Sequence, residues 1–166
     1  VVVHNFRPQA MARLGLDYPA VQAVNPAVVY CATYGYSRRG PYGDKGALDD
    51  SIQAASGVAV LQSMVEGEPR YLPTIIADKT AAMVVVQSVL AALFHRQRTG
   101  EGQHLDVALL DVAVAATTHL AQSYLATGRV ASRAGNGSLL FALSNSYRCA
   151  DGPLLIQIGN DGQWAR

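Results

Sequence analysis

The feature that most constrains the fold is a long apolar run at residues 81–94, directly after the segment at residues 72–80. Within the run the only polar side chains are Gln87 and Ser88, and basic residues and Gly100 follow it. This pattern predicts a helix over residues 79–97 that is apolar almost all round and therefore buried between other layers. The run is too short to cross a bilayer comfortably, so no membrane segment is expected.

Asp78 stands immediately before this predicted helix, at the end of a short segment expected to be extended. The position predicts an N-cap, whose carboxylate accepts hydrogen bonds from the free N–H groups of the first turn. A second interpretation is a nucleophilic carboxylate, held at the positive end of the helix dipole and facing a substrate. Position alone leaves both interpretations open.

The rest of the chain alternates β-branched runs with helical stretches, which is typical of an α/β fold with mostly parallel strands. The expected elements are a strand at residues 1–3, helices from Pro8 and Asp17, a buried strand at 27–34, a helix opening at Asp49 or Asp50, the long helix, a second buried helix within 107–126 with a short strand at its start, and a buried strand at 154–158. The opening strand and a helix beginning near the last residues both look cut. We therefore expect a piece of a longer protein.

Composition excludes several classes of protein. Half of the 166 residues are hydrophobic and the formal net charge is +1, which fits a folded domain and gives no strong electrostatic case for nucleic acid. Two cysteines far apart and the absence of a leader pattern favour a reduced, cytoplasmic protein. The four histidines lack the spacing of metal ligands, so no metal is expected.

Basic residues on loops near the first strands form a set suited to a ligand with several phosphates: Arg7, Arg13, Arg38, Arg39 and Lys45.

Short motifs distributed along the whole chain resemble the class III coenzyme A transferases, the CaiB/BaiF-like family that includes formyl-CoA transferase and α-methylacyl-CoA racemase. The motifs are Asn5-Phe6-Arg7-Pro8, Leu14-Gly15-Leu16, Asn25-Pro26, Tyr34-Gly35-Tyr36, Gly40-Pro41-Tyr42, Gln53-Ala54, Ser56-Gly57, Ala77-Asp78, Ala91-Ala92-Leu93-Phe94-His95-Arg96, Thr99-Gly100-Glu101-Gly102-Gln103, Leu110-Asp111, Tyr124-Leu125-Ala126-Thr127-Gly128, Gly135-Asn136, Asp151-Gly152 and Gly159-Asn160-Asp161.

The resemblance implies part of a Rossmann-like large domain at residues 1–128, followed by a linker and the start of a smaller domain at 129–166. It also implies two chains interlocked as a homodimer. The implied ligands are coenzyme A, bound as an acyl-CoA substrate, and a small carboxylic acid.

By resemblance, Asp78 attacks the thioester carbonyl and then carries the coenzyme as an aspartyl thioester. The N–H groups of the first helical turn are expected to help stabilise the oxyanion. The implied coenzyme A contacts are Asn5, Phe6, Arg7, Arg13, Lys45, Ala47, Leu48 and Asp49.

One departure from the family concerns the racemase branch, which uses a histidine paired with the aspartate. Leu48 occupies that position here, and leucine cannot carry a proton, so racemization is the alternative and transfer the main prediction. A third possibility is a catalytically inactive fragment that binds coenzyme A or forms oligomers.

Overall fold

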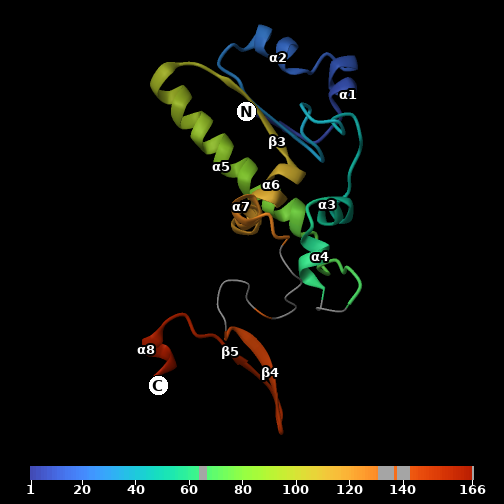
Figure 1. Ribbon diagram of the computed structural model, residues 1–166. Coiled ribbons are helices and arrows are strands. Elements are labelled where there is room, and N and C mark those ends of the chain that lie inside the picture. Colours follow the sequence, from blue (N-terminus) through green and yellow to red (C-terminus); the bar gives the residue numbers. More distant parts are fainter. Residues whose placement is uncertain (64–66, 131–136, 138–142, 166) are drawn as a thin grey trace.

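A parallel three-stranded sheet forms the centre of the fold in the computed structural model, which describes residues 1–63, 67–130, 137 and 143–165 (Figure 1). Its strands are β1 (Val2–His4), β2 (Val29–Tyr34) and β3 (Gln103–Ala108), in the order β1-β2-β3. Every pairing in this sheet is parallel, with Val2 opposite Tyr30 and Cys31 opposite Leu105. The predicted α/β class with a mostly parallel sheet is confirmed.

Helices cover both faces of the sheet. Successive side chains of β2 point to opposite sides, so each face buries its own set of β2 residues. Tyr30 and Ala32 face α1 (Pro8–Arg13) and α2 (Tyr18–Val24) and pack with Met11 and Val28. Cys31 faces the other way and packs with residues of β3, α5 (Ile76–Thr99) and α6 (Leu109–Ala116). The uninterrupted apolar character of β2 follows from burial on both faces.

The first two helices begin where the sequence predicts. Pro8 is the first residue of α1, where its missing N–H costs no hydrogen bond. Asp17 is the N-cap of α2 and accepts a hydrogen bond from the Ala20 N–H at 3.3 Å. These short connections place α1 directly after the residues that leave β1.

The prediction that α5 is buried all round is wrong. Among its residues only Ala77, Ala81 and Ala92 are buried. An apolar stripe remains exposed, and its members are Met83, Val86, Leu90 and Phe94. The reason is that α5 packs along one side only, against the sheet and α6. The helix α5 is also long and apolar enough to cross a membrane. Core helices of soluble proteins can have the same length and composition.

Two further elements differ from the prediction. The segment before Asp78 contains no strand, and α5 begins at Ile76. The predicted second buried helix is divided: β3 extends to Ala108 because it pairs with β2 along that length, and α6 and α7 (Thr118–Thr127) are separated at Thr117. Of these two helices, only α6 has buried residues.

Two short helices complete the part of the fold that lies beside the start of α5. They are α3 (Asp49–Ala55) and α4 (Val58–Gln62), separated by Gly57 at φ +82°. This left-handed backbone conformation suits glycine.

The C-terminal elements form an antiparallel hairpin, β4 (Asn145–Cys149) and β5 (Gly152–Ile156), followed by α8 (Asp161–Trp164). The prediction of a buried strand here is wrong, since Leu154 is 49% and Leu155 75% exposed. In Figure 1 the hairpin lies apart from the parallel sheet. Most of the predicted linker lies outside the described residues, as does the Gly135-Asn136 motif.

Because one aliphatic residue is buried and another is exposed, replacing each with alanine should change the free energy of unfolding by very different amounts. Ile52 is fully buried and packs on Ala77 and Ala113, whereas Leu90 is 60% exposed. We expect Ile52→Ala to lower the free energy of unfolding by about 2–5 kcal/mol because it leaves a cavity. Leu90→Ala should change it by less than about 0.5 kcal/mol. Urea denaturation followed by circular dichroism compares the two variants, and equal losses would contradict the exposure of the stripe.

Candidate functional site

A cavity of about 620 Å³ lies where the carboxyl ends of β1 and β2 meet the start of α5. Ligands of open α/β sheets bind at this edge, outside the carboxyl ends of the strands. Four predicted site residues from three separate segments line the cavity together: Asn5, Ala47, Leu48 and Asp78. The fold therefore brings the predicted nucleophile next to part of the predicted coenzyme A site.

A second cavity, of about 220 Å³, adjoins the first and contains the cationic residues Arg7 and Lys45. The two cavities share Asn5, Tyr34, Gly35 and Ala47 among their lining residues. Because walls are shared, the cavity with the two cations and the cavity with the Asp78 carboxylate are direct neighbours.

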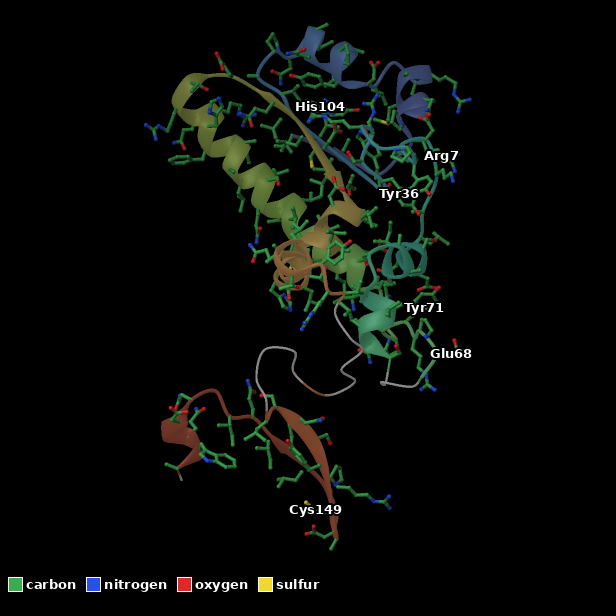
Figure 2. All side chains as sticks on the ribbon, viewed as in Figure 1. Arg7, Tyr36, Glu68, Tyr71, His104 and Cys149 are labelled. Carbon is green, nitrogen blue, oxygen red and sulfur yellow. The ribbon has the colours of Figure 1, made fainter. Side chains whose placement is uncertain are left out.

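Both cations lie close to neighbouring residues. The Arg7 guanidinium, on the side chain labelled in Figure 2, lies so close to Gly46 that a Cβ there would be 2.7 Å from Nη2. The ammonium group of Lys45 lies 4.3 Å from the centre of the Tyr42 ring, a cation–π contact. The Gln9 side chain also donates to Asp44 Oδ1 at 2.9 Å, which ties α1 to the loop that carries Lys45.

The prediction that Asp78 is the N-cap of the long helix is wrong. Ile75 is the N-cap, and Asp78 is the third residue of α5. The backbone N–H of Asp78 donates to Asp49 Oδ1 at 2.9 Å, so another carboxylate performs the capping. In the described part of the chain, no hydrogen bond or ion pair reaches the Asp78 carboxylate itself. That carboxylate is left free at the wall of the larger cavity.

The expected help from first-turn N–H groups stays a prediction, and two of these groups already donate hydrogen bonds within the protein. The Ile76 N–H donates to Thr74 O at 2.8 Å, and the Asp78 N–H is held by Asp49. Donors already engaged in this way do not stabilise an oxyanion without rearrangement. Among the cavity residues, the Asn5 carboxamide is a neutral side-chain donor on the same wall.

The surroundings of Asp78 raise the pKa of its carboxyl group. The larger cause is partial removal of water by neighbouring protein atoms, although the residue is exposed on its cavity side. The second cause is the negative charge of Asp49. A carboxylate whose charge is less well solvated is a better nucleophile than one fully hydrated or hydrogen-bonded.

Asp49 is buried, with 6% of its surface exposed. Both of its oxygens accept hydrogen bonds, Oδ1 from the Asp78 N–H and Oδ2 from Gln53 Nε2 at 2.6 Å. Asp49 lines neither cavity and contacts the site through the backbone of α5. The sequence motifs assign no role to Gln53, and its spacing four residues after Asp49 on one helix is the signal that pairs the two.

Besides Asp49, two more predicted coenzyme A contacts lie outside the paired cavities. Phe6 is 60% exposed, and Arg13 lies exposed in the last turn of α1. Neither lines the cavities that contain Arg7, Lys45 and Asp78. Phe6 directly follows Asn5, and Arg13 is the last residue of α1.

Comparison with known proteins gives consistent results. The model of CoA-transferase family III matches residues 1–166. The chain is 37% identical over 166 residues to a succinate–glutarate CoA-transferase from Agrobacterium fabrum, covering 100% of this chain and 42% of that protein. It is 33% identical to an acetyl-CoA:oxalate CoA-transferase from Acetobacter aceti, covering 97% of this chain and 42% of that protein.

Solved structures agree. A CaiB/BaiF family protein from Brucella suis superimposes with a TM-score of 0.86 at 34% identity, covering 98% of this chain and 43% of that chain. A hypothetical protein from Mycobacterium tuberculosis superimposes with a TM-score of 0.84 at 29% identity, covering 98% of this chain and 43% of that chain. The chain thus spans less than half the length of the relatives that it matches.

Proposed function

Because the chain belongs to CoA-transferase family III, we propose that it transfers coenzyme A between an acyl-CoA and a carboxylic acid through a thioester on Asp78. The observation that carries this proposal is the free Asp78 carboxylate on the wall of a cavity, beside a second cavity that holds two cations. A carboxylate that accepts no hydrogen bond keeps its lone pairs for attack on a carbonyl carbon.

In the first half-reaction, a carboxylate oxygen of Asp78 attacks the thioester carbonyl of the donor. The C–S bond breaks, the coenzyme A thiolate leaves and a mixed anhydride forms. The thiolate then attacks the aspartyl carbonyl, and the donor acid departs as its carboxylate. The aspartyl–coenzyme A thioester remains, with no net uptake or release of protons.

In the second half-reaction, the carboxylate of the acceptor acid attacks the aspartyl thioester and expels the thiolate. The thiolate attacks the acceptor carbonyl of the new anhydride, which forms the product acyl-CoA and regenerates the Asp78 carboxylate. Asn5 is the side chain that we assign to polarise the reacting carbonyl, because it shares the cavity wall with Asp78.

Arg7 and Lys45 are proposed to bind the phosphates of coenzyme A. Both carry fixed positive charge on the wall of the adjoining cavity, and guanidinium groups pair phosphate oxygens in a bidentate manner. Ala47 and Leu48 supply the apolar wall between the phosphate end and the thioester end. Phe6 and Arg13, which line neither cavity, are proposed as outer contacts.

The acids named for the relatives are small dicarboxylates: succinate and glutarate in one case and oxalate in another. We therefore propose succinyl-CoA as the donor to be tested first and glutarate as the acceptor. The racemase alternative is less well supported because Leu48 lines the Asp78 cavity and the described lining residues of that cavity include no histidine.

The decisive experiment uses a favourable tryptic peptide. Cleavage after Arg70 and Lys79 releases residues 71–79, in which Asp78 is the only side-chain carboxylate. The protein is incubated with succinyl-CoA and treated with hydroxylamine, which attacks the aspartyl thioester and releases coenzyme A. The expected product is a hydroxamate on peptide 71–79, dependent on succinyl-CoA. Coenzyme A binding without this hydroxamate would indicate an inactive binder, and α-proton exchange in deuterium oxide would indicate a racemase.

The pH dependence of Asp78 labelling follows from its raised pKa. Only the ionised carboxylate attacks, so labelling should rise with pH and level off above the pKa of Asp78. Because partial desolvation and Asp49 raise that pKa, the midpoint should lie above the usual range of an aspartate. Initial rates of labelling at saturating succinyl-CoA measure the midpoint. A midpoint at or below the usual range would contradict the influence of desolvation and of the Asp49 charge.

Removal of the Arg7 charge should weaken coenzyme A binding. We expect Arg7→Gln to raise the dissociation constant about 10- to 100-fold, since a charge-assisted hydrogen bond contributes about 1.5–3 kcal/mol. Arg98→Gln is the matched control, because Arg98 lies in the last turn of α5, at the opposite end from Asp78. Isothermal titration with coenzyme A compares the two, and equal weakening would exclude a specific role for Arg7.

A further inference from the structure

The buried carboxamide of Gln53 makes hydrogen bonds in several directions. Only 1% of this residue is exposed. Its Nε2 donates to Asp49 Oδ2 at 2.6 Å and to Thr74 O at 3.2 Å, and its Oε1 accepts from the Leu72 N–H at 2.8 Å. One side chain on α3 therefore binds both Asp49 and the segment at residues 72–74.

These contacts converge on the start of α5 by two routes. Through the first, Gln53 holds Asp49, and Asp49 Oδ1 accepts from the Asp78 N–H. Through the second, Gln53 donates to the Thr74 carbonyl, which also accepts from the Ile76 N–H at 2.8 Å. The helix turn that carries Asp78 is thus fixed on both sides by the same carboxamide.

We propose that Gln53 is a positioning residue for Asp78. Its carboxamide locks Asp49 and residues 72–74 so that Asp49 caps α5 and the Asp78 carboxylate remains free to face the cavity. The inference rests on the proposed function, because it assigns Gln53 a role in the formation of the Asp78 thioester. Gln53 itself lines neither cavity and does not touch the substrate.

The chemistry of the carboxamide explains why glutamine occupies this position. Asp49 requires a donor and the Leu72 N–H requires an acceptor, and an amide side chain offers both on one planar group at any pH. An apolar side chain of the same length satisfies neither. Asp49 would then lose its partner on Oδ2 and become free to rotate away from the Asp78 N–H.

The test compares Gln53→Met with Gln62→Met, which changes an exposed glutamine on α4. The measurement is the single-turnover rate of hydroxamate formation on peptide 71–79 at saturating succinyl-CoA, normalised to the fraction of protein that binds coenzyme A. We expect Gln53→Met to lower this rate about 10- to 100-fold with an unchanged dissociation constant for coenzyme A, because misplacing a reacting group by about 1 Å has effects of that size. Gln62→Met should match the wild type.

A second variant serves if Gln53→Met does not fold. Gln53→Glu keeps the length and the acceptor oxygen but places a carboxylate against Asp49. When Glu at position 53 is protonated it donates to Asp49 again, so the ratio of variant rate to wild-type rate should rise as the pH falls. A residue that only stabilised the fold would leave the normalised rate of both variants equal to the wild type at every pH.

The outcomes separate the two proposals. Wild-type protein that forms no hydroxamate on peptide 71–79 overturns the proposed function and this inference with it. Wild-type protein that is labelled, together with Gln53 variants labelled at the same normalised rate, overturns the positioning role alone. A lower rate in Gln53→Met, with an unchanged dissociation constant for coenzyme A, supports both.

Discussion

Replacement of Asp78 with asparagine is expected to lower coenzyme A transfer by at least about 10³-fold, the scale of losing a catalytic nucleophile. The amide nitrogen and oxygen of asparagine cannot form the aspartyl thioester, so the hydroxamate on peptide 71–79 should vanish as well. Steady-state transfer from succinyl-CoA to glutarate and peptide mass spectrometry measure the two effects.

The same variant should remain folded and should still bind coenzyme A. No described hydrogen bond involves the Asp78 carboxylate, and the backbone N–H that Asp49 caps is unchanged by the substitution. The raised pKa of Asp78 also indicates that the folded state accepts an uncharged side chain at this position. Since folding favours the protonated form of Asp78, this group contributes most stability below its unfolded pKa, and that contribution is lost as the pH rises through its folded value. Persistent transfer by Asp78→Asn, or labelling of the peptide at residues 46–70 instead, would refute the assignment of the nucleophile.

Replacement of Asp49 with alanine should produce the largest loss of stability among the charged residues of the site. The change leaves the Asp78 N–H and one of the two N–H groups of Gln53 Nε2 without their acceptor. Each buried donor left unsatisfied costs about 1–3 kcal/mol, so we expect the free energy of unfolding to fall by about 2–4 kcal/mol. Urea denaturation measures this loss.

Asp50→Ala is the matched control for this change. Asp50 is the next residue in the first turn of α3 and is exposed. Its removal should change the free energy of unfolding by less than about 0.5 kcal/mol. Equal losses in the two variants would show that helix-dipole effects, which both carboxylates share, exceed the hydrogen bonds of Asp49.

Asp49→Ala should also shift the pH profile of Asp78 labelling. Removal of the neighbouring negative charge lowers the pKa of Asp78, so the ionised nucleophile should be present at lower pH. The midpoint of labelling is then expected to move down, while the plateau rate falls because the first turn of α5 is less well held. Asp49 thus combines two effects, positioning and charge, that the pH profile separates.

Much of the fold could be predicted from the chain because the signals are local. Pro8 and Asp17 mark helix starts, and Gly100, at φ +80°, marks the end of α5. The apolar run of β2 indicates a strand covered on both faces, and the structure places helices on each side. Such signals depend on the backbone conformation of a few neighbouring residues, which a sequence displays directly.

The sequence predicted which residues belong to the candidate site better than it predicted how they are arranged. The resemblance named Asp78, Asn5, Ala47 and Leu48, and the fold brings these four to one cavity. It also named Phe6, Arg13 and Asp49, which line neither cavity. Gln53 could not be assigned a role, because its partners at residues 72–74 are about 20 positions away and become neighbours only when α3 packs beside the start of α5.

What the sequence alone determined is the position of the first strands and helices, the parallel α/β class and the identity of the acidic residue at the start of the long helix. The tertiary structure decided which residue caps that helix and which faces of the helices are buried. Asp78 is a residue type that commonly caps helices. Asp49 supplies the capping carboxylate instead, because the packing of α3 brings it to the Asp78 N–H. The apolar stripe of α5 is exposed for a similar reason, since burial depends on what packs against a helix and not on the helix alone.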